Sequence, residues 1–469
     1  MPDAFAPVLV ASLPATVCPT QLSPISSGTP PPVNALLTDL YELNMAASYL
    51  RRGMTGTATF SLFVRSLPPA RGFLVAAGVE SCLDLLADLR FEEDDIRYLG
   101  DAQGFETRDL EAFRRLRFTG DVWAMPEGRI ALAGEPILEV TGPLPEAQLV
   151  ETLFLNQVTF ETTIASKAAR CVIAAQDRDV VDFSFRRTQG IEAGIDVARL
   201  SSMVGFVATS NVEAARRFGL VAAGTMAHSY IEAFADEAAA FRAFAQDCPG
   251  RATFLVDTYD TITGIKRAIA VIKELGLEGR LGIRIDSGDL VALSRRGRRL
   301  LDRAGLRDVR IFVSGGLDEM SIDKLVRDGA VIDAFGVGTR MGVSADHPYL
   351  DTAYKLVCYE GRPVMKLSRG KVSEPGRKQV FRRARPFGDL VGLFDEPVPA
   401  GRERLLEQLM VGGKRRDDRE PVSQARARFE ADLEKLPAGA RSISSPRPPV
   451  ARPTAALRKL TWETRQKLA

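Results

Sequence analysis

Three arginines in this 469-residue chain follow or lie within short apolar runs, where a guanidinium group could meet a bound anion. Arg186 and Arg187 come after the run DFSF, and Arg284 lies inside GIRIDSGDL. Bidentate binding of phosphate or carboxylate is the distinctive use of arginine. These residues therefore predict a site for an anionic substrate, although Arg284 could equally form a structural ion pair with Asp286, two positions later.

Four aspartates lie in the same kind of position, after apolar runs. Carboxylate oxygens there could hold Mg²⁺ or stabilise a positive charge that develops on a sugar. The alternative is that each aspartate caps the helix that follows it. The four are Asp257, Asp260, Asp286 and Asp289. Of these, Asp257, Asp286 and Asp289 are the candidate metal ligands, and Asp286 is also a candidate catalytic carboxylate.

The chain has two histidines, His228 and His347, which excludes metal chemistry built on several imidazoles. His228 follows the run LVAAGT, and an imidazole beside arginines and phosphate-binding loops can act as a nucleophile or proton carrier toward a phosphoryl group. A hydrogen-bonded structural role is the alternative. His347 lies in a proline-containing loop, where we expect a structural role.

Two glycine-rich turns end the last two apolar runs. Backbone N–H groups of such turns at a helix start are suited to holding phosphate, and barrels usually bind phosphate at their last two strand ends. Turns also need glycine for backbone conformation alone, so each turn by itself is weak support. The candidate substrate-binding residues here are Ser314, Gly315, Gly316, Gly336, Gly338 and Thr339.

Regular strand-helix units must position these residues. Between residues 179 and 340 short apolar or β-branched runs alternate with helical segments, a pattern that favours a parallel sheet, either closed as a barrel or doubly wound. The polar residues then gather at the carboxyl ends of the strands, where α/β enzymes place their active sites. Seven such runs end near residues 182–187, 204–211, 220–228, 253–260, 281–289, 310–316 and 333–340.

The flanking segments predict a different architecture. Apolar spacing and turn residues indicate a helix over 36–49 with Thr38 as its N-cap, a strand over 59–65, and hairpins over 118–142. A long helix is expected over 146–175, a hairpin over 354–367 and a charged helical stretch over 402–436. We expect a proline-rich disordered tail over 1–33 and a solvated basic tail over 440–469.

Composition narrows the class of protein. Lys+Arg total 62 and Asp+Glu 60, so the formal net charge of +2 gives no reason to expect a nucleic-acid partner. No stretch approaches 18 apolar residues without charge, which argues against a membrane span. The five cysteines form no Cys-x-x-Cys pair, which fits a reducing compartment and a cytoplasmic location.

At this point the sequence closely resembles the nicotinate phosphoribosyltransferases over roughly residues 34 to 385. Seven ordered motifs coincide with the strand ends inferred above or lie before them. They are TDLYELNM (38–45), DFSFRRTQG (182–190), GTMAHSYIEAF (224–234), VDTYDT (256–261), IRIDSGDL (283–290), VSGGLDE (313–319) and FGVGTRMG (335–342).

The resemblance implies an irregular parallel β/α (TIM-like) barrel, over 151–345, with a smaller α+β domain. That domain would be built from N- and C-terminal segments, over 34–150 and 346–439, and the enzyme would be a homodimer with shared active sites. The implied reaction joins nicotinate to 5-phosphoribosyl 1-diphosphate, with ATP hydrolysis and Mg²⁺, to give nicotinate mononucleotide in the salvage of NAD.

The resemblance also assigns roles to individual residues. His228 matches the histidine that ATP phosphorylates. Tyr41, Thr225 and Arg284 match positions that bind nicotinate, and Tyr41 would reach the neighbouring subunit's site. Thr339 matches a phosphoribosyl diphosphate contact. The residues Arg186 and Asp286 match related ligand-binding positions.

Two other classes of protein stay open from the sequence. The segment FLVDTYDTITG resembles, with one extra residue, the phosphoribosyl diphosphate motif of purine and orotate phosphoribosyltransferases, which have another fold and use no ATP. A relative that prefers nicotinamide is a finer alternative. The non-enzymatic alternative is a degenerate barrel that only binds ligands, although an intact His228 and Arg284 argue against it.

Overall fold

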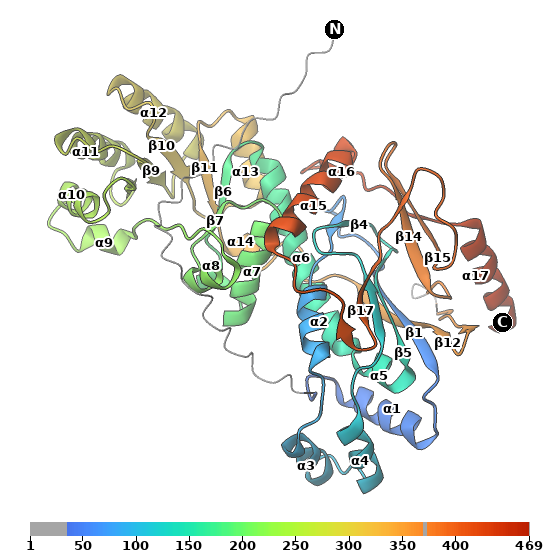
Figure 1. Ribbon diagram of the computed structural model, residues 1–469. Helices are drawn as coiled ribbons and strands as arrows, with labels where there is room; N and C mark the ends of the chain where they lie inside the picture. The colour runs from blue at the N-terminus through green and yellow to red at the C-terminus, as the bar shows by residue number, and fades with distance from the viewer. Residues whose placement is uncertain (1–34, 369–372, 469) are drawn as a thin grey trace.

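Helix α6 (Glu151–Ala175) joins two lobes of the molecule, as Figure 1 shows. The computed structural model describes residues 35–368 and 373–468. Every residue of α6 from Glu161 to Cys171 is buried, because the helix contacts elements of both lobes. It packs against α7 and α13 of the parallel-sheet lobe, and against β2 and α2 of the small lobe.

The parallel-sheet lobe contains a six-stranded sheet in the order β7-β6-β11-β10-β9-β8. Its strands are short and mostly buried, as expected of parallel strands covered on both faces. All neighbouring pairs are parallel, so their carboxyl ends share one edge. The strands are β6 (Asp179–Asp182), β7 (Ala208–Thr209), β8 (Thr253–Leu255), β9 (Gly282–Ile285), β10 (Arg310–Val313) and β11 (Ala334–Val337).

The expected barrel is confirmed only in part. Six of the seven predicted runs contain a strand, but the run at 220–228 contributes a single bridge, between Ala222 and Thr209. That run is largely exposed, Val221 to 51%, and therefore lacks the burial on both faces that a parallel strand requires. In the described part of the chain the sheet is accordingly a curled half-barrel with β7 and β8 at its edges.

Helices follow the strands of this lobe and begin beside the carboxyl-end edge. Three of the longer ones, α11, α12 and α13, start at aspartates whose side chains accept a hydrogen bond from the third helical N–H group. The helical elements are η1 (Phe185–Arg187), α7 (Ile191–Met203), α8 (Val212–Phe218), α9 (His228–Glu232), α10 (Glu237–Asp247), α11 (Thr261–Glu274), α12 (Leu290–Arg303), α13 (Glu319–Arg327) and α14 (Thr339–Gly342).

The small lobe is built on a seven-stranded antiparallel sheet in the order β13-β12-β1-β5-β3-β17-β18. Strand β1 (Thr57–Val64) pairs on one side with β5 (Pro136–Pro143) and on the other with β12 (Thr352–Tyr359). The sheet therefore joins segments from both sides of the parallel lobe in the sequence. The predicted strand at 59–65 and the hairpin at 354–367, between β12 and β13 (Arg362–Pro363), are confirmed.

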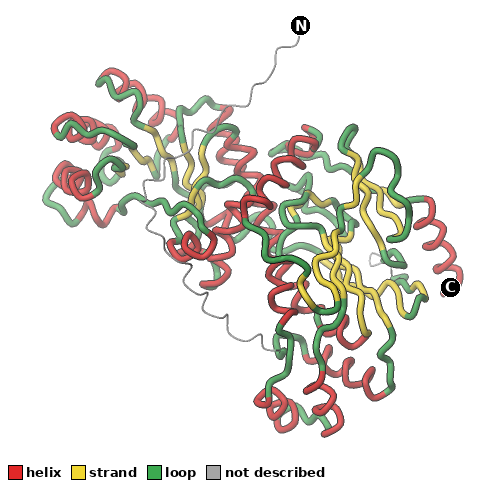
Figure 2. The backbone as a smooth tube through the Cα atoms, viewed as in Figure 1, coloured by secondary structure: helices red, strands yellow, loops and turns green. Residues whose placement is uncertain are grey.

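Two further sheets and several helices complete the small lobe, as the tube in Figure 2 shows. The remaining strands are β2 (Leu74–Val75), β3 (Asp121–Ala124), β4 (Ile130–Ala131), β14 (Lys378–Arg383), β15 (Gly388–Leu393), β16 (Glu403–Arg404), β17 (Glu407–Val411), β18 (Lys414–Arg415) and β19 (Arg452–Pro453). The helices are α1 (Leu40–Arg51), α2 (Val79–Ala87), α3 (Glu93–Asp101), α4 (Thr107–Arg115), α5 (Leu144–Leu149), α15 (Val422–Lys435), α16 (Ala438–Arg441) and α17 (Ala455–Leu468).

Two sequence-based expectations for the C-terminal part are wrong. The stretch 402–436 is helical only in α15, because its first half forms β16, β17 and β18. The stretch from 440 onward is not a solvated tail. There β19 pairs with β15, and Leu457 of α17 is fully buried, so apolar contacts outweigh the basic composition.

Two helix boundaries also differ from the predictions. The helix expected over 146–175 is divided into α5 and α6 at Val150. Helix α1 begins after Asp39 rather than Thr38, because the Thr38 hydroxyl instead donates a hydrogen bond to Glu42. The expected tail over 1–33 lies outside the described residues. Within those residues we find no helix with the length and apolar character needed to span a membrane.

Candidate active site

A cavity of about 310 Å³ lies at the carboxyl ends of the parallel strands. It brings together residues that the sequence singled out on three separate segments, which meet at one edge of the sheet although they are distant in the chain. The lining residues are Phe183, Arg186, Ser210, Gly224, Thr225, Met226, Ala227, His228, Leu255, Arg284 and Asp286.

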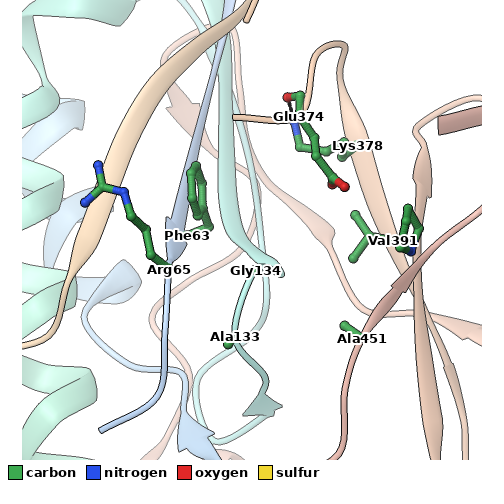
Figure 3. Close-up of a pocket in the computed structure, with 9 residues that line it drawn as sticks. Phe63, Arg65, Ala133, Gly134, Glu374, Lys378, Val391 and Ala451 are labelled. Carbon is green, nitrogen blue, oxygen red and sulfur yellow. Dashed lines mark hydrogen bonds between the residues drawn. The ribbon is translucent and has the colours of Figure 1, made fainter. Parts of the chain in front are cut away.

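A larger cavity, of about 360 Å³, lies in the small lobe but contains none of the predicted site residues. Figure 3 shows Phe63, Val391 and Ala451 around it, with the Glu374 carboxylate directed toward its interior. We therefore place the candidate active site in the smaller cavity of the parallel-sheet lobe.

Arg284 is the central side chain of this site. It lies on β9, between Leu255 of β8 and Phe312 of β10 in the sheet register. Its Nε donates to Ser314 Oγ at 2.7 Å and its Nη2 donates to Asp286 Oδ1 at 2.8 Å. The guanidinium carbon lies 5.4 Å from the centre of the Phe183 ring. These contacts fix the plane of the guanidinium group, and the predicted ion pair with Asp286 is present.

The remaining contacts of Arg284 are longer. Nη1 donates to Thr225 Oγ1 at 3.1 Å and to the Met226 carbonyl at 3.5 Å. Thr225 and Met226 both line the cavity. The Nη1 edge is therefore the part of the guanidinium group that an anion in the cavity could approach.

Asp286 and Asp257 are linked through the backbone of Asp286. Burial alone would raise the pKa of Asp286, but hydrogen bonds from Ser314 and Arg284 outweigh burial and lower the pKa below its ordinary value. Asp257 Oδ2 accepts hydrogen bonds from the Asp286 backbone N–H at 3.0 Å and from the Ser287 hydroxyl at 2.6 Å. The other oxygen of Asp257, Oδ1, is buried and has no hydrogen-bond partner.

The other two predicted aspartates are helix caps. Asp260 accepts from the Thr263 N–H at 2.8 Å, and Asp289 accepts from the Ala292 N–H at 3.0 Å. Asp289 thus caps a helix, as the alternative interpretation predicted, and this hydrogen bond makes it less suited to bind a metal ion. Across residues 35–368 and 373–468 no three His, Cys, Asp or Glu side chains are grouped so as to hold a metal ion.

His228 is the first residue of α9 and is partly exposed in the cavity. Its Nδ1 lies 3.1 Å from the Thr258 hydroxyl oxygen, a contact that orients the ring. Thr258 belongs to the segment VDTYDT, which also carries Asp257 and Asp260. His347 does not line the cavity, and its ring lies 5.0 Å from that of Tyr349; its structural role stays a prediction.

None of the predicted glycine-turn residues lines the cavity, but both turns pack against residues that do. We call residues 314–319 the first glycine loop and residues 338–346 the second glycine loop. A β-carbon on Gly315, whose φ is +98°, would stand 1.9 Å from the Asp286 carbonyl oxygen, and one on Gly338 would stand 2.9 Å from the Phe183 carbonyl oxygen. Both loops therefore pack their backbones directly onto residues that carry or line the site.

Comparison with known proteins identifies the family. The family model described as the nicotinate phosphoribosyltransferase (NAPRTase) N-terminal domain matches residues 36–159, and that of the nicotinate phosphoribosyltransferase (NAPRTase) family matches residues 179–432. This chain belongs to the nicotinate phosphoribosyltransferase family. The resemblance inferred from the seven motifs is thereby confirmed.

Individual members of the nicotinate phosphoribosyltransferase family agree with this assignment. A nicotinate phosphoribosyltransferase of Mycobacterium tuberculosis is 46% identical over 416 residues, which cover 88% of this chain and 89% of the relative. One of Bacillus subtilis is 42% identical over 381 residues, covering 78% and 77%. The crystal structure of the human nicotinic acid phosphoribosyltransferase superposes with a TM-score of 0.80 at 27% identity, covering 91% of this chain and 99% of that chain.

Some residues that match the motifs of the nicotinate phosphoribosyltransferase family lie away from the cavity. Tyr41, 48% exposed, lines a separate surface depression with Thr152, Asn156 and Tyr349. Its hydroxyl donates to Glu42, and burial together with nearby carboxylates raises the pKa of Tyr41 well above its ordinary range. Within one chain the structure therefore does not bring Tyr41 to Arg284.

Two arginines and a threonine among the predicted residues are exposed, and one of the three lines the cavity. Arg187 and Thr339 are both exposed and do not line the cavity, whereas Arg186, also exposed, does. The sequence analysis missed Phe183 and Ser210, which line the cavity, and Thr258, which contacts His228. Thr258 could have been found, because it lies inside a recognised motif. Phe183 also lies inside a motif, DFSFRRTQG, but an aromatic residue after a strand gives no sign that it will face an arginine.

Proposed function

We propose that this chain transfers the phosphoribosyl group of 5-phosphoribosyl 1-diphosphate to nicotinate, giving nicotinate mononucleotide and diphosphate. ATP hydrolysis through a phosphohistidine at His228 would drive the reaction. The observation that carries the proposal is the placing of an oriented arginine, an oriented histidine and an ionised aspartate around one cavity, in a chain of this family.

Nicotinate would bind with its carboxylate toward Arg284 Nη1 and the Thr225 hydroxyl. A carboxylate accepts two charge-assisted hydrogen bonds from such donors, whereas an amide carries no charge. Arg284 is already fixed by Asp286, Ser314 and Phe183, so little side-chain entropy is lost when the substrate binds. This arrangement favours nicotinate over nicotinamide.

The diphosphate-bearing substrate would bind along the two glycine loops, with Ser314, Gly315, Gly316, Gly338 and Thr339 as the predicted contacts. The remaining predicted contact, Gly336, lies in β11 just before the second loop. Asp286, whose low pKa keeps it ionised, would stabilise the positive charge that develops at the sugar carbon as diphosphate leaves. Arg186 on the cavity rim would add a cation near the anionic groups.

The residues present fit a magnesium ion, although they form no complete ligand cage. Mg²⁺ commonly binds through one or two carboxylates, with waters and substrate phosphates as its other ligands. Asp257 offers a buried carboxylate oxygen without a hydrogen-bond partner, which suits this mode of binding. When bound, Mg²⁺ would neutralise charge on the leaving diphosphate.

At His228, Nδ1 is engaged by Thr258, so Nε2 is the nitrogen that can attack the γ-phosphorus of ATP. A bond from Nε2 to phosphorus would form as the bond to the ADP oxygen breaks. Water would later cleave the phosphohistidine, releasing phosphate and returning the neutral imidazole.

A homodimer with shared sites would explain the position of Tyr41, which lies in its own surface depression apart from Arg284. In this arrangement, Tyr41 of each subunit completes the nicotinate site of the other.

An assay of product formation tests the proposed function. Radiolabelled nicotinate, nicotinamide and quinolinate would each be incubated with phosphoribosyl diphosphate and Mg²⁺, with and without ATP. We expect nicotinate mononucleotide as the main product, with ATP increasing its yield. Equal use of nicotinamide, or turnover that ATP does not change, would contradict the substrate or the ATP coupling respectively.

A further inference from the structure

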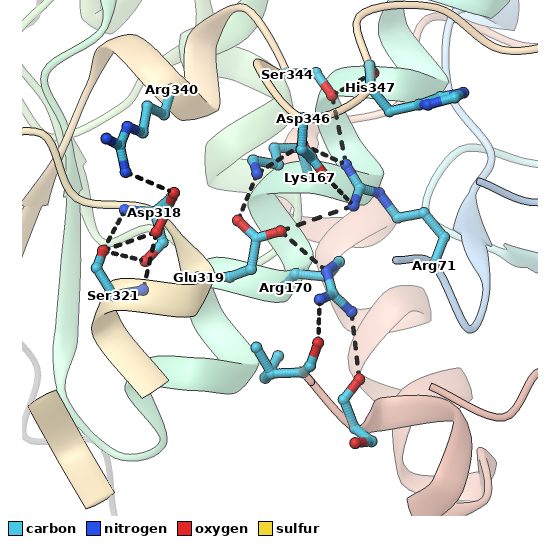
Figure 4. A network of polar contacts seen from close by, with 12 residues as sticks. Arg71, Lys167, Arg170, Asp318, Glu319, Ser321, Arg340, Ser344, Asp346 and His347 are labelled. Carbon is cyan, nitrogen blue, oxygen red and sulfur yellow. Dashed lines mark hydrogen bonds and ion pairs between the residues drawn. The ribbon is translucent and has the colours of Figure 1, made fainter. Parts of the chain in front are cut away.

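A group of buried charged side chains lies beside the two glycine loops and takes no part in the chemistry proposed above (Figure 4). We call Arg71, Lys167, Arg170, Glu319 and Asp346 the charge cluster. Each of these side chains except Asp346 is at most 2% exposed. Buried charges persist only where they are paired, so the pairs they form show what the cluster connects.

Two cations of the charge cluster each contact one carboxylate from each glycine loop. Lys167 Nζ, on α6, lies 2.6 Å from Glu319 of the first loop and 2.7 Å from Asp346 of the second. Arg71 Nη1, between β1 and β2, lies 3.7 Å from Glu319 and 2.7 Å from Asp346. Figure 4 shows both carboxylates directed toward these cations. The two loops are thus tied to each other through side chains of other elements.

A third tie joins the loops directly at the surface. Arg340 of the second loop donates from Nη1 to Asp318 Oδ2 of the first loop at 3.0 Å, and the Arg340 side chain is 54% exposed. Asp318 also caps α13 by accepting from the Ser321 N–H. The tie therefore ends on a carboxylate that is itself fixed.

The second glycine loop contains a strained residue next to the charge cluster. Ser344 is fully buried and has a φ of +43°, a conformation that residues other than glycine rarely adopt. Its hydroxyl accepts from Arg71 Nη2 at 3.5 Å and donates to the His347 carbonyl at 2.7 Å. Such a conformation persists only where its surroundings hold it, so the shape of this loop depends on the cluster.

We propose that Arg340, Lys167 and Glu319 are positioning residues that hold the two glycine loops at the separation needed to bind the phosphate groups of phosphoribosyl diphosphate. The inference rests on the proposed function, in which both loops bind that substrate. Breaking a tie should raise KM for phosphoribosyl diphosphate more than KM for nicotinate. Of the side chains that hold Arg284, only Ser314 belongs to a glycine loop, whereas Asp286 and Thr225 lie outside both loops.

The exposed tie gives the cleanest test, because Arg340→Met should not unfold the chain. The matched control is Arg327→Met, which removes an exposed arginine of α13 that pairs with Asp323. We expect Arg340→Met to raise KM for phosphoribosyl diphosphate by about three- to fivefold, which corresponds to the free energy that an exposed ion pair contributes. The KM for nicotinate should rise by less than about twofold. Equal increases for both substrates, or none, would overturn the proposal.

A double-mutant cycle separates positioning from direct contact with the substrate. Asp318→Asn keeps a side chain that can cap α13 but removes the charge that Arg340 binds. If Arg340 acts through Asp318, each single variant raises KM for phosphoribosyl diphosphate by a similar factor, and the double variant raises it little further. If the two effects add, or if Asp318→Asn lowers KM, Arg340 binds phosphate directly and the positioning role is wrong.

The buried tie is tested by Lys167→Met, with Lys167→Arg as the conservative variant and circular dichroism as the check on folding. Calorimetric titration with phosphoribosyl diphosphate, without nicotinate, gives Kd directly. We expect Lys167→Met to weaken binding by at least about tenfold and Lys167→Arg to recover part of the loss. If Lys167→Met fails to fold, the Arg340 series decides alone.

The two proposals fail in different ways. Wild-type protein that does not bind phosphoribosyl diphosphate, or does not consume it with nicotinate, overturns the proposed function. Wild-type protein that binds it, together with Arg340→Met and folded Lys167→Met that bind it equally well, overturns only the positioning role.

Discussion

At the residue scale, Arg284 has both of the roles that the sequence left open, the structural ion pair and the anion-binding group. It forms the ion pair with Asp286, and its Nη1 edge still faces the cavity. The two roles are compatible because a guanidinium group carries five N–H donors. Arg284 therefore both lowers the pKa of Asp286 and offers an anion site.

We predict that Arg284→Leu weakens nicotinate use far more than nicotinamide use. A hydrogen bond to a charged group contributes roughly 1.5 to 3 kcal/mol, so apparent affinity for nicotinate should fall at least about tenfold. Arg284→Lys should recover only part of the loss, because an ammonium group lacks the planar fork. Steady-state kinetics on both substrates decide this, and equal weakening of both would refute the carboxylate assignment.

A second residue-scale prediction concerns phosphorylation of His228. His228→Ala should fold normally but show no acid-labile, base-stable label after incubation with γ-labelled ATP, because the imidazole nitrogen is the attacking group. Thr258→Val is the matched control: it keeps the imidazole but removes the Nδ1 contact, so labelling should slow without disappearing. Equal labelling of wild type and His228→Ala would exclude the phosphohistidine at this position.

At the element scale, Asp346 makes the tie between the two glycine loops sensitive to acid. Burial alone would raise its pKa, but Arg71 and Lys167 outweigh burial and lower the pKa well below its ordinary value. A carboxyl group whose pKa is depressed on folding stabilises the folded state above its unfolded pKa of about 3.9, and that contribution is lost as pH falls toward the folded pKa.

We therefore predict that Asp346→Asn lowers the free energy of unfolding by roughly 2 kcal/mol at pH 7, the scale of charge-assisted hydrogen bonds. The difference from wild type should narrow as pH falls below about 4, because Asp346 of the unfolded chain then takes up a proton while the folded carboxyl stays ionised until its own, lower pKa is reached. Urea unfolding at pH 7 and at lower pH measures both values. A difference that is constant with pH would mean that Asp346 acts by packing rather than by charge.

The C-terminal helix α17 gives another element-scale prediction. Leu457 is fully buried, whereas Trp462 on the same helix is 63% exposed. Leu457→Ala should cost about 2 to 5 kcal/mol of stability through lost burial and the cavity left behind, and Trp462→Ala should cost much less. Chemical denaturation of the two variants checks this. Similar small effects would show that α17 is not part of the stable fold.

At the scale of the whole molecule, shared active sites predict complementation between inactive subunits. Tyr41→Ala and Arg284→Leu should each be nearly inactive toward nicotinate. In a mixed dimer, one site receives Tyr41 and Arg284 from the two different chains, so dissociating and reassociating an equal mixture should restore about a quarter of wild-type activity. Activity that stays at the level of the separate variants would place Tyr41 outside the partner's site.

The sequence by itself determined the family, the alternation of strands and helices and five of the eleven residues that line the site. Arg186, Arg284 and Asp286 follow or lie in runs that form parallel strands, and parallel strands bring their carboxyl ends to one edge. Thr225 and His228 follow a run that forms only a single bridge. Local rules sufficed there, because strand ends, helix caps and glycine turns depend on neighbouring residues in the chain.

Only the tertiary structure decided which of the alternative roles each residue takes and which distant segments meet. Asp257 and Asp289 have similar sequence surroundings, yet one has an unpartnered oxygen beside the site and the other caps a helix. The run at 220–228 is largely exposed although the sequence predicts a strand there, and Leu457 is buried although the sequence predicts a solvated tail there. Both predictions are wrong because burial depends on contacts with residues far away in the sequence. The ties from Lys167 to Glu319 and Asp346 span 152 and 179 positions, so no local pattern could reveal them.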